Sequence, residues 1–328
     1  MKKKILAVVG ATGLVGNVFL NVLEEKKIEF DDYYLFASKK SEGRIIPFMG
    51  QDRRVTELTR ENIKNKGITH ALFSAGSAIS KEFAPLFVKE GALVIDNSSQ
   101  WRSHENCPLV VPEVNISDAF ENEGIIANPN CSTIQAVVVL KPLDDAFRIK
   151  RIVYDTYQAV SGAGRKGSAD LLDGIEGRSP KFFPKPVFSN VIPQIDSFDE
   201  NGYTKEELKM INETKKILHR QDLRITATTV RVPVFTGHAE SVNIEFEKPC
   251  SVEEVKDILS KSKGIILFNE NEYPTPLDVV GKDEVFVGRI RKDFSIENGI
   301  NLWIVADNLR KGAGTNAVQI LEAILKNS

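Results

Sequence analysis

The sequence has few cysteines, no long apolar run and no excess of either charge. Only three cysteines occur among 328 residues, which argues against a disulfide framework and favours a reducing, cytoplasmic compartment. No stretch approaches the roughly 18 consecutive apolar residues of a membrane span. The lysine-rich start, MKKKILAVVG, leads into a glycine loop and not into a cleavage site, so we do not interpret it as a signal peptide. We therefore expect no membrane partner.

The charge balance and the scarcity of metal ligands argue against further classes. The chain has 43 basic and 45 acidic residues and a net charge of −2, which gives no electrostatic footprint for nucleic acid. His104 and Cys107 have the spacing of half a metal site, but no second pair stands near them, so no metal site is expected. The length and the 42% hydrophobic content suit a globular protein of two domains.

A glycine loop between an apolar run and a helical pattern stands near the start. Residues 4–9, KILAVV, are typical of a strand buried on both faces. GATGLVG follows and leads into the helical spacing of 17–27. The pattern G-x-x-G-x-x-G departs from the strict dinucleotide fingerprint, so an ordinary strand-to-helix turn stays an alternative to nucleotide binding. The expected nucleotide contacts are Gly10, Thr12, Gly13, Leu14, Val15 and Gly16.

The second strand, expected at 33–38, ends in a sequence that favours NADP over NAD. A site for NAD usually has an acid here, about 20 residues past the loop, to bind the ribose 2′-hydroxyl. This chain instead has Ser38, Lys39, Lys40 and Ser41, which suit a 2′-phosphate. A solvated lysine pair is the alternative.

Further apolar runs predict that the first half is a doubly wound, mostly parallel sheet of the Rossmann type. They lie at 69–75, 92–98 and 109–114, with a helical pattern between the first two. Ligands bind such sheets at the carboxyl ends of the strands. Ser74 lies at one such end, and Arg102 follows another, either as an anion ligand or as a surface arginine.

Cys131 lies where a strand end meets a helix start. GIIANPN (124–130) is typical of a strand and its exit, and an apolar helix follows. A helix N-terminus favours a thiolate by about 1 kcal/mol. Its open N–H groups could stabilise an oxyanion, with the amide of Asn130 beside them. The alternative is a buried, unreactive thiol, and we interpret Cys107 and Cys250 in this way.

The second half predicts an α+β domain on a mixed sheet, because strands and helices no longer alternate. His238 lies in RVPVFTGHAESV, at a predicted turn between strands, seven residues after Arg231. A lone histidine is more often structural, but the turn and the arginine favour a functional role. Gln158 precedes a glycine-rich turn and is uninformative alone. The expected helices are 166–176, 204–219, 251–262 and 312–327, and the expected strands include TATTVRVPV, ESVNIEFE, EVFVGRIRKDFS and INLWIVADNL.

Several motifs occur together and in a specific order: GATGLVG, NPNCST, YQAVSGAG, RVPVFTGHAE and ADNLRKGAGTNAVQI. In combination they closely resemble the aspartate-β-semialdehyde dehydrogenase family, over almost the full chain. That family is similar to glyceraldehyde-3-phosphate dehydrogenase in fold and chemistry. The resemblance implies an NADP-binding domain at 1–130, a catalytic and dimerisation domain at 131–310, and a C-terminal helix at 311–328 that packs back on the first domain.

The resemblance also implies an activity and its catalytic residues. L-aspartyl 4-phosphate would be reduced with NADPH to L-aspartate 4-semialdehyde and phosphate, on the way to lysine, methionine and threonine. Cys131 would be the nucleophile that forms a thioester, His238 the acid and base, and Gln158 the residue that orients the intermediate.

Substrate and cofactor contacts follow by the same resemblance. Glu206 would bind the substrate amino group, with Glu207 as the alternative if one residue is inserted or deleted. Helical i, i+3 spacing puts Glu206 and Lys209 on one face. Arg231 would bind the α-carboxylate, and the phosphate contacts would be Arg102, Asn130 and Lys209. The further cofactor contacts would be Ser161, Gly162 and Asn308.

The resemblance leaves the assembly and two rival functions open. It implies a homodimer or a homotetramer, with 182–194 as a candidate contact. N-acetyl-γ-glutamyl-phosphate reductase has a similar fold plan and a cysteine–histidine pair, but its cysteine lies in a different local motif. A non-catalytic relative would act as a binding protein, yet Cys131 and His238 are both present.

Overall fold

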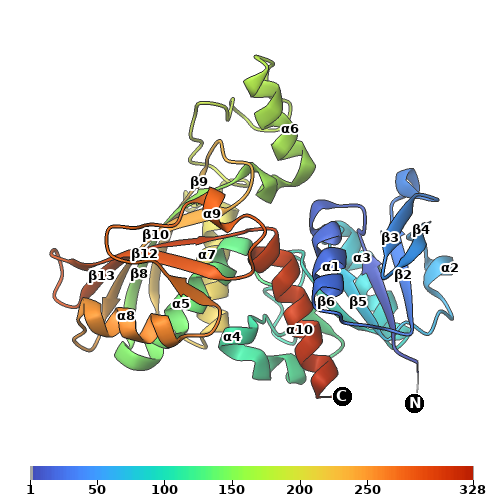
Figure 1. Ribbon diagram of the computed structural model, residues 1–328, viewed down its shortest axis with the longest axis horizontal. Helices are drawn as coiled ribbons and strands as arrows, with labels where there is room; N and C mark the ends of the chain where they lie inside the picture. The colour runs from blue at the N-terminus through green and yellow to red at the C-terminus, as the bar shows by residue number, and fades with distance from the viewer. Residues whose placement is uncertain (1–2, 328) are drawn as a thin grey trace. The chain divides into compact units, whose positions relative to one another are not determined.

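The computed structural model describes residues 3–327 of the chain. These divide into two compact units, which Figure 1 shows as ribbons. The first unit runs to Pro129 and resumes at Ala313, and the second is Asn130–Gly312. Each unit has its own sheet.

The first unit is a seven-stranded sheet in the order β3-β4-β2-β1-β5-β6-β7. All neighbours are parallel except β3 and β4, which confirms the predicted doubly wound plan. The strands are β1 (Ile5–Val9), β2 (Asp32–Ala37), β3 (Ile45–Phe48), β4 (Gln51–Glu57), β5 (His70–Phe73), β6 (Leu93–Asp96) and β7 (Ile125–Ala127). The helices are α1 (Leu14–Glu25), α2 (Arg60–Ile63), α3 (Ser77–Lys89), α4 (Pro112–Asn115) and α10 (Thr315–Lys326), with 3-10 turns η1 (Lys39–Ser41) and η2 (Ile116–Glu121).

Two elements of this sheet differ from the sequence prediction. The strand expected at 109–114 is wrong, because Pro112 opens helix α4 and Leu109 makes only an isolated bridge to Ala127. Proline has no N–H for a ladder but suits the first position of a helix. The β3–β4 hairpin was not predicted, since β4 is mostly polar and β3, at the sheet edge, has only four residues. Met49 and Gly50 form its turn, both with positive φ.

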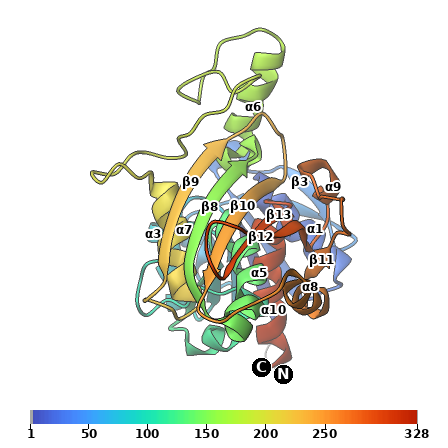
Figure 2. The same cartoon turned by 90° about the vertical axis from the view of Figure 1, so that its left-hand side faces the viewer.

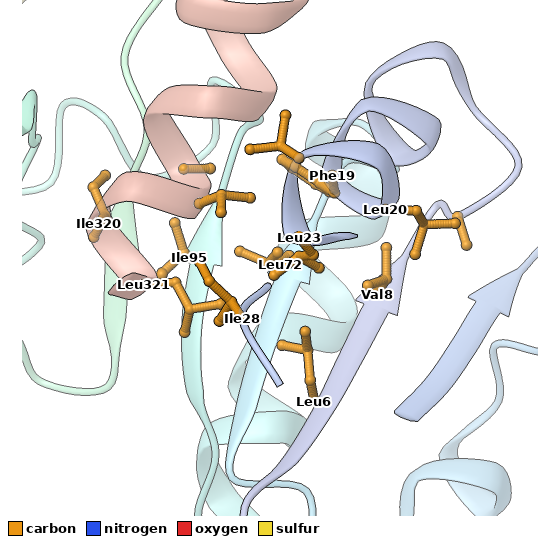
Figure 3. Close-up of a cluster of buried hydrophobic side chains, with 14 of the residues drawn as sticks. Leu6, Val8, Phe19, Leu20, Leu23, Ile28, Leu72, Ile95, Ile320 and Leu321 are labelled. Atoms are coloured by element: carbon orange, nitrogen blue, oxygen red, sulfur yellow. The ribbon is translucent and has the colours of Figure 1, made fainter. Parts of the chain in front are cut away.

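The core of the first unit lies on both faces of the sheet, because successive side chains of a strand point to opposite faces. Ala7 and Val9 face the cluster that includes Phe83 and Phe87 of α3. On the other face α1 and α10 pack against the strands (Figure 3). The labelled contacts there come from β1 (Leu6, Val8), β5 (Leu72), β6 (Ile95), α1 (Phe19, Leu20, Leu23), the loop after it (Ile28) and α10 (Ile320, Leu321).

The second unit is a six-stranded mixed sheet in the order β11-β12-β13-β10-β8-β9. The β8–β9 and β11–β12 pairs are parallel and the others antiparallel, which confirms the predicted α+β class. Its strands are β8 (Ile149–Gln158), β9 (Arg224–Arg231), β10 (His238–Phe246), β11 (Ile265–Leu267), β12 (Val285–Asp293) and β13 (Gly299–Ala306). Its helices are α5 (Cys131–Phe147), α6 (Gly164–Ile175), α7 (Lys205–Ile217), α8 (Val252–Lys261) and α9 (Pro276–Val279), with a 3-10 turn η3 (Val160–Ala163) and a π turn η4 (Arg310–Gly314) at the unit boundary.

One face of the mixed sheet is covered by helices. Figure 2 shows β9, β8 and β10 side by side, and α5 contacts β8 and β10 while α7 contacts β9. Along β10, His238, Glu240 and Val242 are fully buried, as the two-residue period of a strand requires. His238 is the first residue of β10, so its predicted place in a turn is wrong. Across residues 3–327, every helix is too short or too polar to cross a bilayer.

Candidate active site

The glycine loop of the first unit is held by backbone contacts. Gly10 has a φ of +84°, and a Cβ there would lie 2.3 Å from the carbonyl oxygen of Ser74. A Cβ on Gly16 would lie 2.1 Å from the carbonyl oxygen of Gly10. Gly13 caps α1 without a side-chain hydrogen bond, so the first N–H groups of the helix point out of the loop. This geometry suits a phosphate held by backbone.

The residues expected to choose between NADP and NAD follow β2. Lys39 and Ser41 lie in η1, and Ser41 Oγ is 3.3 Å from Thr12 Oγ1. The parallel strands β1 and β2 thus bring the two loops together at their carboxyl ends. Lys39 and Lys40 are exposed.

Arg102 is anchored to the carboxyl ends of β6 and β7. Its Nε donates to Asn128 O at 3.0 Å and its Nη2 to Asn97 O at 2.9 Å. Asn128 is buried, and its side chain accepts from Asn316 Nδ2 at 2.7 Å and donates to Asn97 Oδ1 at 2.7 Å. The guanidinium is therefore held in a defined position within the first unit.

Cys131 is the first residue of α5 and is half-buried. Asn130 caps this helix, because its Oδ1 accepts from the N–H groups of Ser132 at 3.0 Å and Thr133 at 3.3 Å. The expectation of open N–H groups is therefore wrong for Ser132 and Thr133. The positive end of the helix still lies at the thiol.

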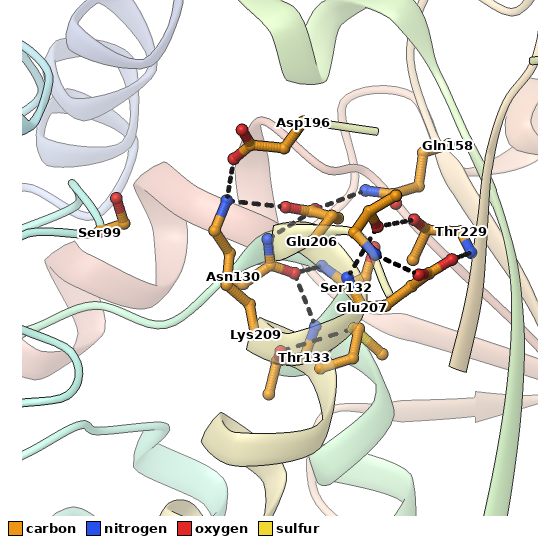
Figure 4. Close-up of polar contacts among 12 residues, drawn as sticks. Ser99, Asn130, Ser132, Thr133, Gln158, Asp196, Glu206, Glu207, Lys209 and Thr229 are labelled. Carbon is orange, nitrogen blue, oxygen red and sulfur yellow. Dashed lines mark hydrogen bonds and ion pairs between the residues drawn. The ribbon is translucent and has the colours of Figure 1, made fainter. Parts of the chain in front are cut away.

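A cluster of polar side chains surrounds Glu206, as Figure 4 shows. Glu206 Oε1 accepts from Asn130 Nδ2 at 2.8 Å and Gln158 Nε2 at 3.0 Å, and Oε2 accepts from Lys209 Nζ at 3.0 Å. Burial opposes ionisation, but the Lys209 charge and these hydrogen bonds outweigh it and lower the pKa of Glu206 to about 2. The buried Glu206 therefore forms an ion pair with the partly exposed Lys209.

Glu207 faces a different set of partners. Its side chain completes a capping box with Thr204 and accepts from the N–H of Thr229 at 3.0 Å. Glu206, and not Glu207, thus lies in the cluster with Asn130 and Gln158.

His238 is fully buried beside Ala159. The N–H of Ala159 donates to Nδ1 at 3.0 Å, so the proton of the neutral imidazole is on Nε2. Burial, with the Arg231 charge nearby, lowers the pKa of His238 to about 3. Its Nε2 has no hydrogen-bond partner within the described part of the chain. His238 is thus a neutral donor at pH 7.

Arg231 is only 5% exposed, and its guanidinium carbon lies 5.8 Å from the ring centre of Phe183. Its Nη1 donates to Ala159 O at 2.6 Å, and its Nε has no hydrogen-bond partner among residues 3–327. Burial lowers the pKa of Arg231, and the charges of Glu206 and Cys131 oppose this shift. A Cβ on Gly162 would lie 3.1 Å from Arg231 Nη1 and 3.2 Å from His238 Nε2, so both donors border this glycine.

Asn308 joins the remaining predicted cofactor contacts of this unit. Its Nδ2 donates to Ser161 Oγ at 3.0 Å, and its Oδ1 accepts from the N–H of Gly237 at 2.8 Å. These bonds hold the turn after β8 against the turn before β10.

Comparison with known proteins places this geometry in a family. Residues 5–122 match the family model "Semialdehyde dehydrogenase, NAD binding domain", and residues 140–311 match "Semialdehyde dehydrogenase, dimerisation domain". The chain is 53% identical over 333 residues to the aspartate-semialdehyde dehydrogenase of Aquifex aeolicus, covering 98% of both chains. The chain belongs to the aspartate-semialdehyde dehydrogenase family.

Solved structures of this family agree. Aspartate semialdehyde dehydrogenase II from Vibrio cholerae, complexed with ASA, matches with a TM-score of 0.96 and 46% identity over 99% of each chain. The enzyme with NADP from Candida albicans matches with a TM-score of 0.75 and 26% identity over 98% and 99%. The resemblance seen in the sequence is confirmed: the chain is an oxidoreductase with an NAD(P)-binding domain and a dimerisation domain.

The sequence did not point to three acids of the second unit. Asp196 accepts from Lys209 Nζ at 3.0 Å, and Glu213 accepts from the N–H of Asn130 at 2.6 Å. Glu213 follows Glu206 by two helical turns, a signal that could have been used. Glu240 is fully buried two residues after His238. Among the residues that the structure describes, no group of three or more His, Cys, Asp or Glu could hold a metal ion.

Proposed function

We propose that the chain catalyses the NADPH-dependent reductive dephosphorylation of L-aspartyl 4-phosphate to L-aspartate 4-semialdehyde, for lysine, methionine and threonine synthesis. The observation that carries the substrate class is Arg231. A guanidinium that is 5% exposed and has an unpartnered Nε is costly unless an anion binds there. It borders the donor of His238, in the same unit as the thiol of Cys131.

The first unit is proposed to hold NADP. Gly10 and Gly16 let the backbone approach a pyrophosphate, with the uncapped start of α1 facing it. Lys39 and Lys40 would bind the 2′-phosphate. The Candida albicans relative, which was solved with NADP, supports this choice. The bound cofactor supplies hydride.

Cys131 is proposed to attack the acyl carbon of L-aspartyl phosphate as a thiolate. The carbon–oxygen bond to phosphate breaks, phosphate leaves, and a thioester to Cys131 remains. Once hydride has reached the thioester carbon, the carbon–sulfur bond breaks and releases the aldehyde and the thiolate. The helix start at Cys131 favours the thiolate before and after the reaction.

His238 is proposed to move the proton through Nε2. Its Nδ1 is occupied by the N–H of Ala159, so Nε2 is the nitrogen that can exchange a proton with the substrate. The low pKa keeps His238 neutral, and Nε2–H would donate to the developing oxyanion and to the hemithioacetal oxygen. Gln158, held by Glu206, would orient the intermediate.

The substrate contacts follow from charge. Arg231 would bind the α-carboxylate in a bidentate manner, and the ionised Glu206 would bind the α-ammonium. Lys209, Asn130 and Arg102 are proposed to bind phosphate. Ser161, Gly162 and Asn308 are proposed to border the nicotinamide.

The second unit is also the proposed site of assembly. The dimerisation-domain match supports a homodimer, and light scattering of the purified protein would distinguish it from a tetramer. A cytoplasmic location is proposed, because the chain has only three cysteines among 328 residues.

The test is phosphate-dependent NADPH formation from L-aspartate semialdehyde. We expect activity in the wild type, none above background in Cys131→Ala, and a loss of kcat/KM of about 100-fold or more in Arg231→Ala, because a desolvated charge pair is lost. Lys263→Ala, on an exposed residue of the same unit, is the control. Activity only with N-acetylglutamate semialdehyde would favour the reductase, and no activity with either substrate a non-catalytic binding protein.

A further inference from the structure

Glu240 is a fully buried carboxyl group that the proposed mechanism does not use. It lies on β10, where its cross-strand neighbours are Thr156 on β8 and Ile304 on β13. Gln158 and His238 lie two residues further along β8 and two residues earlier on β10, on the same face of the sheet, which the helices cover. Both carboxyl oxygens lack a hydrogen-bond partner within the described residues.

Two side chains of α5 face this carboxyl group. Ser132 and Gln135 are fully buried and lie three residues apart on one face of the helix. Ser132 Oγ and Gln135 Oε1 also lack partners in the part of the chain that the structure describes. Ser132 directly follows Cys131, so these atoms lie under the first turn of the proposed nucleophile's helix.

The hydrogen-bonding atoms of Ser132, Gln135 and Glu240 can all be satisfied only if one of them carries an additional proton. Gln135 Nε2 donates to the carbonyl of His238 at 3.4 Å, and the opposite amide orientation would set two carbonyl oxygens against each other. Gln135 Oε1 therefore needs a donor. A carboxylate can only accept, whereas a carboxylic acid donates through one oxygen and accepts from Ser132 Oγ–H through the other.

We propose that Glu240 is a neutral carboxylic acid that joins Ser132 and Gln135 to β10 and so positions Cys131 relative to His238. Burial raises the pKa of Glu240 well above its ordinary value, and Ser132 and Gln135 only partly offset this rise, which supports the neutral form. Glu240 acts through these neighbours and is a positioning residue. This role rests on the proposed dehydrogenase function.

A neutral Glu240 also favours the thiolate form of Cys131. The titratable groups around Glu240 are Cys131 and His238, which adjoin its partners on α5 and β10, and Tyr154 on β8, whose pKa is raised by burial. An ionised Glu240 would raise the pKa of the Cys131 thiol and lower its reactivity.

Three variants test the proposal. Glu240→Gln keeps one donor and one acceptor, and we expect kcat within about threefold of the wild type. Glu240→Leu keeps the volume without the hydrogen bonds, and we expect kcat to fall about 10- to 100-fold with KM little changed. The control is Val242→Ala, a core truncation one row further along β10, which should lower Tm but leave kcat within about twofold.

Protonation is measured independently of turnover. The pH dependence of alkylation of Cys131 by iodoacetamide, followed by mass spectrometry, reports the thiol pKa. If Glu240 is neutral, Glu240→Gln leaves this pKa unchanged, and the infrared band of a protonated carboxyl disappears. A thiol pKa lowered by about one unit in Glu240→Gln would mean that a negative charge was removed, and would overturn the proposal.

Kinetics can overturn it as well. The positioning role would be excluded if kcat fell as far in Glu240→Gln as in Glu240→Leu. It would also be excluded if Glu240→Leu kept the kcat of the wild type. If the wild type lacked the dehydrogenase activity, the proposed function would fail, while alkylation and the infrared band would still decide the charge of Glu240.

Discussion

The candidate site of the first unit is formed mainly by backbone atoms, whereas the candidate site of the second unit is formed by buried side chains. Around Gly10 and Gly16 the chain approaches itself so closely that a single Cβ would collide with a carbonyl oxygen. In the second unit Glu206, Arg231 and His238 are each 6% exposed or less. The first design suits a ligand held by N–H groups, and the second suits chemistry that needs shifted pKa values.

The difference also separates what each site can tolerate. A site formed by backbone is disrupted when a substitution adds side-chain volume at a close backbone contact, whether the new side chain is polar or apolar. A side-chain site is broken when one partner of a buried polar group is removed, because the other is left unsatisfied. Mutations that add volume and shifts in pH should therefore affect the two units differently.

The largest effect is expected for Gly16→Ala. The new Cβ would lie 2.1 Å from the carbonyl oxygen of Gly10, and because the obstacle is backbone, α1 must move away from β1. We expect NADPH binding, measured by titration calorimetry, to weaken about 100-fold or more. Asn17→Ala, on the next residue of α1, should bind as the wild type does.

The second unit should not respond to this change. Alkylation of Cys131 should proceed at the wild-type rate in Gly16→Ala, since the thiol belongs to the other compact unit. Wild-type NADPH affinity in this variant would show that close backbone approach is not what forms the nucleotide site.

The next effect is on stability at acid pH. Burial lowers the pKa of His238 from 6.5 to about 3 and that of His70, on β5 of the first unit, to about 4. The unfolded chain binds these protons from about pH 6.5 downward and the folded chain does not, so the unfolding free energy falls between about pH 6.5 and 3 and is unaffected above. For His238 this loss is about 3 kcal/mol at pH 4.

Urea unfolding at several pH values measures this slope. His238→Gln and His70→Gln should each be less sensitive to acid than the wild type. Only His238→Gln should lose activity, and His70→Gln should keep NADPH affinity because its unit relies on backbone. An unchanged slope in His238→Gln would contradict the neutral imidazole.

The sequence predicted what depends on local pattern. The apolar run at 4–9, the glycine loop and the helix start at Cys131 are all short-range features, and the structure has them. The prediction failed at Pro112, where an apolar run was taken for a strand although proline favours a helix start. The β3–β4 hairpin was missed because its polar residues lack the alternation of a half-buried strand.

The contacts missed in the second unit depend on distant segments. Asn130 meets Glu206 and Glu213, which are 76 and 83 residues away, and Asp196 comes from an irregular segment. Such contacts are set by tertiary packing, which local periodicity does not encode. Glu240 is different, because it has the same strand parity as Val242, Ile244 and Phe246, and this period of two was a signal for a core-facing position.

The smallest effect is expected at the two lysines after β2. They are the proposed side-chain ligands in a site that is otherwise formed by backbone. Lys39 and Lys40 are exposed, so their attraction to a 2′-phosphate is screened by water and salt. We expect the double variant Lys39→Ala/Lys40→Ala to raise the KM for NADPH about tenfold, with the KM for NADH unchanged. The effect should shrink at high ionic strength, and Lys89→Ala, on an exposed lysine of α3, should show none. An equal rise for both cofactors, or a wild type that uses NADH as well as NADPH, would contradict the 2′-phosphate assignment and leave these lysines as solvated surface charges.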